Sequence, residues 1–180
     1  MKSIKEMTQG ELGAYVQSHL RQKGIKVVLS GGAAVGIYSN NKYVSKDLDF
    51  VNVFATNRRI IHTAMAEIGF KEEGRYFKHP DTEFFVEFPP GPLTVGYEPV
   101  KEVTERRFST GSLDIISPTD CVKDRLAAYY HWGDRQCLAQ AQLVAKEHPV
   151  DLNEIKRWST SEEKLDEFER IKDLFIDSSV

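Results

Sequence analysis

Cysteine is scarce in this 180-residue sequence, which contains two cysteines. Cys121 and Cys137 lie outside any Cys-x-x-Cys spacing, and both fall within segments of helical pattern. A disulfide-stapled secreted scaffold and a zinc module of closely spaced cysteines are therefore excluded. We expect two structural thiols and a cytoplasmic protein.

Long apolar runs and an excess of basic residues are also missing. No segment approaches the length of a membrane span, and the first residues, MKSIKEMTQGEL, carry charges where a signal peptide needs an apolar region. We therefore expect no membrane partner. The 24 basic and 27 acidic residues give a formal net charge of -3, so any contact with nucleic acid would be local rather than spread over a broad basic surface.

The composition is that of a globular protein with a substantial core, because 41% of the residues are hydrophobic and 28% are charged. Thr8 and Glu11 form a capping box that predicts an early helix. Strand-like runs follow, and four amphipathic segments of helical period fill the rest of the chain. We therefore expect an α/β fold with a mixed (α+β) sheet over residues 1–116, and a helical bundle packed on it over residues 117–180 that begins at the helix cap Ser117.

A strand-like run, IKVVL, is followed directly by two glycines. Gly31 and Gly32 fall where this strand gives way to a helix, so the main chain can approach a ligand closely there. Unpaired N–H groups and the positive end of the helix dipole suit a phosphate group. Taken alone, the glycine pair also fits an ordinary strand-to-helix turn.

Two aspartates follow in the sequence DLDF. In an extended strand, Asp47 and Asp49 point to the same face, while Leu48 and Phe50 point to the other. Adjacent carboxylates repel each other and are best tolerated around a divalent cation, and hard oxygen ligands favour Mg²⁺ or Mn²⁺. Taken alone, DLDF also fits an ordinary strand with one solvated face.

The sequence DLDFV also matches the Asp-x-Asp-x-Val box of haloacid-dehalogenase phosphatases. In that family the aspartates end a buried apolar strand. Here the polar segment NNKYVSK precedes the aspartates and the apolar run FVNVF follows them. This order favours a different family.

The order strand, Gly-Gly, helix and Asp-hydrophobic-Asp-hydrophobic is similar to the nucleotidyltransferase superfamily. The segments LSGGAAVGIY and SKDLDFV resemble its minimal members, including enzymes of the abortive-infection and toxin-antitoxin type. The resemblance implies transfer of a nucleotidyl group from an NTP to an acceptor such as tRNA or protein, with an antitoxin as a partner. It also implies nucleotide binding at Ser30, Gly31 and Gly32. One local departure is Ala33, where relatives often carry Thr or Ser.

The superfamily places a third acidic ligand on a later strand, and Glu87 in TEFFVEF is the best match. Alternation puts Glu87 beside Phe85 on one strand face, where a metal would justify the carboxylate. The resemblance thus implies that Asp47, Asp49 and Glu87 bind Mg²⁺ or Mn²⁺ and act in catalysis. Asp81 and Glu83 are weaker candidates, and a solvent-facing strand glutamate is the plain alternative.

The segment SPTDCVKDRLAAY resembles the helix that follows the core in abortive-infection relatives, where a basic residue faces the active site. Arg125 matches that position and is expected to bind nucleotide. Relatives also carry an Arg-Asp pair on the next helix, whereas this chain has Arg135 and Gln136. The missing acid favours an alternative function, in which a catalytically weak or inactive relative binds nucleotide or a partner protein.

Several basic residues would surround the acidic site if they lay on one side of the fold. We expect them to form one rim that contacts an acceptor. These residues are Arg58, Arg59, Arg106, Arg107, Lys123 and Arg125.

Overall fold

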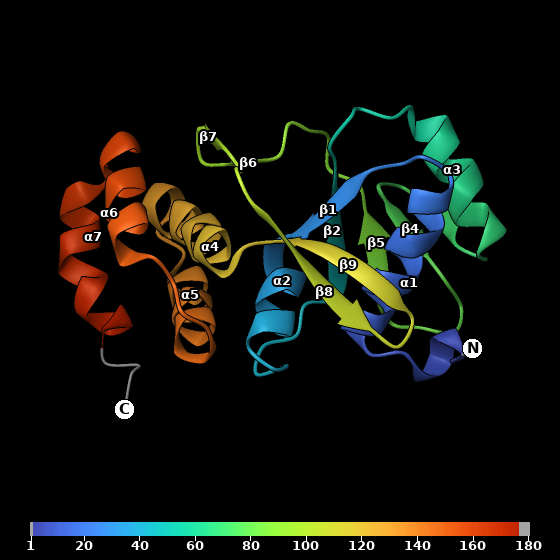
Figure 1. Cartoon of the computed structure of the whole chain (residues 1–180), viewed down its shortest axis with the longest axis horizontal. Coiled ribbons are helices and arrows are strands. Elements are labelled where there is room, and N and C mark those ends of the chain that lie inside the picture. Colours follow the sequence, from blue (N-terminus) through green and yellow to red (C-terminus); the bar gives the residue numbers. More distant parts are fainter. Residues whose placement is uncertain (1, 177–180) are drawn as a thin grey trace.

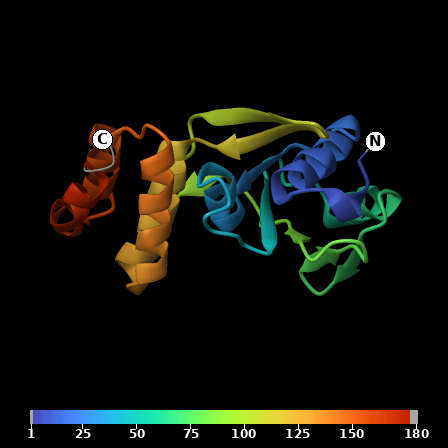
Figure 2. The same ribbon diagram turned by 90° about the horizontal axis from the view of Figure 1, so that it is seen from below.

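A computed structural model describes residues 2–176 of the chain. The strands are β1 (Val27–Ser30), β2 (Asp47–Asn52), β3 (Lys71–Glu73), β4 (Tyr76–Lys78), β5 (Phe85–Glu87), β6 (Thr94–Val95), β7 (Glu98–Pro99), β8 (Val103–Phe108) and β9 (Gly111–Ile116). The helices are α1 (Gln9–Gln22), α2 (Gly31–Tyr38), α3 (Arg58–Glu67), α4 (Pro118–Trp132), α5 (Arg135–Glu147), α6 (Leu152–Ser161) and α7 (Leu165–Ile171), with short 3-10 helices at Ile4–Glu6 and Lys172–Phe175. Figures 1 and 2 show the sheet at one end of the molecule and α4 to α7 at the other.

The predicted mixed sheet is confirmed. Seven strands lie in the order β3-β4-β5-β2-β1-β9-β8, and β6 and β7 form a separate hairpin. β2 is antiparallel to β1, whereas β5 runs parallel to β2 and β9 runs parallel to β1. Sequence patterns missed β3, because its residues, KEE, are charged and largely exposed at the edge of the sheet.

One face of the sheet is covered by α1, which begins at the predicted capping box. Thr8 accepts a hydrogen bond from the Glu11 N–H, and Glu11 reaches back to the Thr8 backbone. A Cβ placed on Gly13 would lie 3.1 Å from the Leu48 side chain, so the helix and β2 pack closely. Because Leu48 faces α1, the alternation of β2 turns Asp47 and Asp49 to the other face of the sheet.

The chain after β9 is helical, as predicted. Ser117 caps α4 by accepting a hydrogen bond from the Asp120 N–H, and proline occupies the first turn. None of the helices among residues 2–176 is long and apolar enough to cross a membrane. Both cysteines are buried and unbonded to each other, in agreement with the expectation of structural thiols.

The β6–β7 hairpin connects the sheet region with the C-terminal helices. The Trp158 Nε1–H donates to the Val95 carbonyl oxygen at 3.2 Å, and the Trp158 ring stacks on Tyr130 with centroids 5.9 Å apart. Beside it, the Arg157 guanidinium donates to both carboxylate oxygens of Glu98. Buried side chains from both regions form one continuous core. The division of the chain at residue 116 stays a prediction.

Replacement of Trp158 tests this junction. Trp158 is fully buried, so we expect Trp158→Ala to lower the free energy of unfolding by about 3–5 kcal/mol, through the cavity and the lost hydrogen bond. Urea denaturation followed by circular dichroism measures the change. Trp132→Ala is the matched control, because Trp132 is 80% exposed and its loss should change stability by less than about 0.5 kcal/mol. Equal effects of the two substitutions would contradict the assignment.

Candidate metal and nucleotide site

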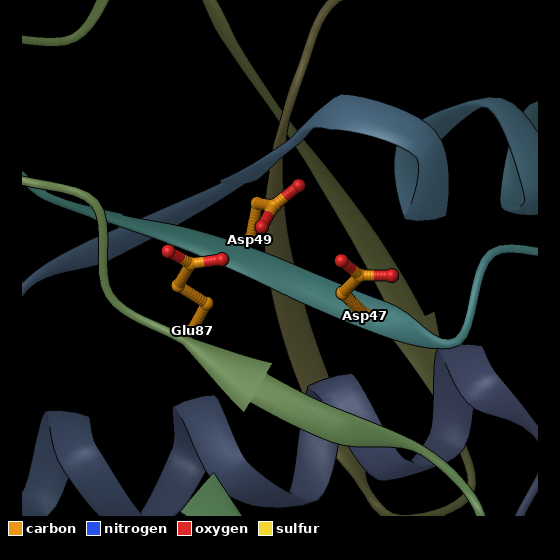
Figure 3. A group of neighbouring side chains, drawn as sticks. All are labelled: Asp47, Asp49 and Glu87. Atoms are coloured by element: carbon orange, nitrogen blue, oxygen red, sulfur yellow. The ribbon is translucent and has the colours of Figure 1, made fainter. Parts of the chain in front are cut away.

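Three partly buried carboxylates lie together on the face of the sheet opposite α1. Asp47 and Asp49 come from β2, and Glu87 comes from β5, where it pairs in register with Asp49. One carboxylate oxygen from each residue lies within 4.8 Å of the other two. Figure 3 shows the three side chains projecting from the same side of β2 and β5. The structure therefore brings together the three residues that the sequence suggested as metal ligands.

The two weaker candidates for the third ligand lie elsewhere. Glu83 is exposed and pairs with Lys46 at 3.4 Å. Asp81 is exposed in the turn between β4 and β5. Alternation along β5 explains why Glu87 is the third carboxylate of the cluster. Glu87 pairs in register with Asp49, and residues paired in register point to the same face of the sheet.

Asp49 has an unusual electrostatic environment. Burial, followed by the charges of Asp47 and Glu87, raises the pKa of Asp49 from 3.8 to about 6. A divalent cation among the three carboxylates would offset their mutual repulsion. Its positive charge would also stabilise the ionised carboxylates in their partly buried environment. An all-oxygen donor set of this kind fits Mg²⁺ or Mn²⁺.

The glycine turn lies beside these carboxylates. Ser30 pairs in register with Asp49 across β1 and β2. Gly31, the first residue of α2, has a φ of +68°, and a Cβ placed on it would lie 2.4 Å from Asp49 Oδ2. Glycine suits this position, because a side chain would strain the backbone conformation and the Asp49 carboxylate would have to shift to make room. The N-terminus of α2, with the backbone of Gly31 and Gly32, therefore adjoins the carboxylate cluster.

Arg125 on α4 lies within electrostatic range of the same cluster. Its charge lowers the pKa of Asp49, whereas that of Asp124 raises it. The Arg125 guanidinium donates to Asp124 and, at 3.3 Å, to Gln140. These partners hold the guanidinium in place, and its predicted contact with nucleotide remains a prediction.

The prediction that the six basic residues form one rim around the acidic site is wrong. Arg58 donates to Glu72 of β3 at one edge of the sheet, whereas Arg107 lies in β8 at the opposite edge. Lys123 is buried in ion pairs with Asp120 and Glu154. The sequence shows how many basic residues there are but does not show which face or edge each one reaches.

One basic residue at the site was missed. The Arg75 Nε atom lies 3.5 Å from Glu87 Oε1. In the sequence, Arg75 only marks the start of a strand-like run, so nothing indicated that it would reach Glu87. Arg75 is the last residue of the turn between β3 and β4. Recognising β3 as a strand would have revealed a hairpin turn at Gly74 and Arg75, and so the proximity to Glu87.

Removal of the Asp49 charge should stabilise the metal-free protein. Because the folded-state pKa of Asp49 is raised from 3.8 to about 6, its ionisation opposes folding, and this cost grows as pH rises through that interval. At about pH 8 in the presence of a chelator, Asp49→Asn should raise the free energy of unfolding by about 1–3 kcal/mol. This increase in the free energy of unfolding should become smaller as the pH is lowered toward about 4, where Asp49 of the wild type is protonated in the folded state. Asp81→Asn, at an exposed site, is the control and should change the free energy of unfolding little. A lower free energy of unfolding for Asp49→Asn than for the wild type at both pH values would contradict this explanation.

Substitution of Gly31 separates backbone strain from crowding of the carboxylate. Gly24 is the matched control, since its φ is +73° and a Cβ there would meet nothing within 4 Å. Gly24→Ala should cost about 1 kcal/mol of unfolding free energy for the backbone conformation alone. Gly31→Ala adds the contact with Asp49, whose carboxylate must shift, and should cost about 1 kcal/mol more than the control. Chemical denaturation measures both, and equal costs would show that Asp49 does not crowd Gly31.

No protein-family model matches the chain, and no curated protein matches it. An antigenic nucleotidyltransferase-like protein from Paracoccidioides brasiliensis is similar in structure, with a TM-score of 0.60 and 13% identity over 76% of this chain and 75% of that one. Lincomycin-bound lincosamide antibiotic adenylyltransferase LnuA gives a TM-score of 0.53 and 16% identity over 77% of this chain and 98% of that one. The mixed sheet and its helices therefore have a nucleotidyltransferase-like fold.

Proposed function

We propose that this protein is a metal-dependent nucleotidyltransferase, which moves a nucleotidyl group from an NTP to an acceptor. The observation that carries the proposal is the three-carboxylate cluster of Asp47, Asp49 and Glu87 beside the Gly31 turn. The nucleotidyltransferase-like fold supports it. Fold alone does not specify an activity, whereas the carboxylates and the glycine turn of the site supply the groups that nucleotidyl transfer needs.

The residues of the site have distinct roles in this proposal. Asp47, Asp49 and Glu87 would hold Mg²⁺ or Mn²⁺, which, when bound, neutralises developing negative charge on the phosphates. The backbone N–H groups at Gly31 and Gly32 would bind the triphosphate, with Ser30 beside them. Arg125 would offset the negative charge of the cluster and contact the nucleotide.

The reaction is an in-line displacement at the α-phosphorus. A hydroxyl oxygen of the acceptor forms the new bond to phosphorus, and the bond between phosphorus and the pyrophosphate oxygen breaks. Pyrophosphate leaves with that electron pair. The hydroxyl proton passes to a carboxylate of the cluster, Asp49 or Glu87.

The acceptor and the biological role rest on the sequence resemblance to abortive-infection enzymes. We propose tRNA or protein as the acceptor, a role as a toxin in the cytoplasm, and an antitoxin as the partner. The structurally similar LnuA carries bound lincomycin, so a small-molecule acceptor is the outcome that would keep the chemistry and remove the toxin role.

A second candidate is a member of this fold that binds nucleotide or a partner protein without efficient catalysis. The hydrogen bonds of Arg125 to Asp124 and Gln140 favour it, because they occupy a guanidinium that the reaction would need. Gln136, at the position of the family's later acidic residue, favours it as well.

Metal with NTP should stabilise the protein, because a ligand that binds only the folded state raises its stability by mass action. We expect Mg²⁺ or Mn²⁺ with an NTP to raise the melting temperature. The double substitution Asp47→Asn and Asp49→Asn should abolish this rise, and so should Glu87→Gln. Glu83→Gln is the matched control and should respond like the wild type. A wild-type response in the double variant would reject the site.

The product released from the NTP separates the alternatives. A nucleotidyltransferase releases pyrophosphate, an aspartyl-phosphate phosphatase releases inorganic phosphate through a covalent intermediate, and a binding protein releases neither. Incubation with labelled NTPs and total cellular RNA, protein or antibiotics identifies the acceptor class. Phosphate trapped on Asp47 would overturn the proposed reaction.

A further inference from the structure

Arg75 is held at the edge of the carboxylate cluster by a braced turn. It follows Gly74 between β3 and β4, and its carbonyl oxygen accepts a hydrogen bond from Arg58 Nη2 at 3.2 Å. Arg58 in turn donates to Glu72 at 2.6 Å. The backbone that carries Arg75 is therefore fixed relative to β3.

The side chain of Arg75 is also oriented. Its guanidinium lies over the Tyr76 ring, 4.8 Å from the centroid, and Nη2 donates to the Tyr76 hydroxyl at 2.6 Å. The hydrogen bond to Tyr76 and then the charge of Glu87 raise the pKa of Arg75, and Asp47 adds a smaller contribution. The side chain nevertheless remains 68% exposed. A guanidinium that is both ordered and accessible loses little entropy when it binds an anion.

Strand order places Arg75 opposite the triphosphate side of the site. β4 lies beside β5, followed by β2 and β1, so the carboxylates separate Arg75 from Gly31 at the end of β1. If the pyrophosphate leaves toward the N-terminus of α2, in-line attack requires the acceptor to approach from the opposite side. That side is formed by β5 and β4, where Tyr76 pairs in register with Glu87.

We propose that Arg75 binds a phosphate of the acceptor, so that the acceptor is a nucleotide or the terminal nucleotide of a nucleic acid. The proposal rests on the proposed function. The guanidinium N–H groups that do not donate to Tyr76 match phosphate oxygens, and a planar guanidinium can also stack on a base. A polycationic acceptor would be repelled by the same group.

The test uses the full chain with Mg²⁺ and a non-hydrolysable analogue of the NTP that stabilises it most. Calorimetry then measures binding of adenosine, adenosine 5′-monophosphate and a short oligoadenylate to that complex. Wild type should bind the monophosphate at least about tenfold more tightly than adenosine. Arg75→Gln should remove this difference, and Arg75→Lys should restore part of it, because the charge returns without the planar fork.

Arg107→Gln is the matched control, because Arg107 is 86% exposed and lies at the far edge of the same sheet. It should retain the wild-type preference. Tighter binding of the oligoadenylate would identify a nucleic-acid end as the source of the phosphate, and equal binding would identify a free nucleotide.

Three results would overturn the role of Arg75. These are no saturable binding of the monophosphate, equal binding of adenosine and the monophosphate by the wild type, and weaker binding of the NTP analogue by Arg75→Gln. The last result would place Arg75 on the triphosphate instead. Failure of the proposed function is distinguishable, because the wild type would then show no metal-dependent binding of the NTP analogue.

Discussion

Repulsion among three carboxylates is the constraint around which this structure is arranged. Asp49 is partly buried beside Asp47 and Glu87, and its burial, followed by the charges of these two neighbours, raises its pKa. Groups of the opposite sign surround the cluster: the N-terminus of α2 at Gly31, Arg125 from α4 and Arg75 from the β3–β4 turn. A divalent cation and a phosphate group would complete the charge balance of this cluster.

Buried side chains on the other face of β2 offset the cost of placing the carboxylates side by side. Leu48 and Phe50 are fully buried on the side of β2 that faces α1, so the strand is held in place independently of its acidic face. A one-residue shift in the register of β2 would bury the aspartates and expose these side chains. Packing on one face therefore fixes the geometry of the carboxylates on the other.

Local patterns were sufficient to predict the elements that carry the site. The capping box at Thr8, the helix cap at Ser117 and the period-two alternation of DLDF each depend on nearby residues, and each is present in the structure. The choice of Glu87 came from the resemblance to the nucleotidyltransferase superfamily, and alternation along the strand supplied only its face. Contacts between residues far apart in the chain could not be predicted from local sequence patterns. Arg75 reaches Glu87 through a hairpin whose first strand is charged, and Arg125 is held by Gln140 from another helix.

The hairpin of β6 and β7 determines how the chain can be divided. It belongs by sequence to the part before β9, but Val95 and Glu98 bind Trp158 and Arg157 of α6. A fragment that ends at Ile116 would leave the Val95 carbonyl and the apolar surface beneath it exposed to solvent. Separately expressed halves should therefore expose apolar surface and tend to aggregate.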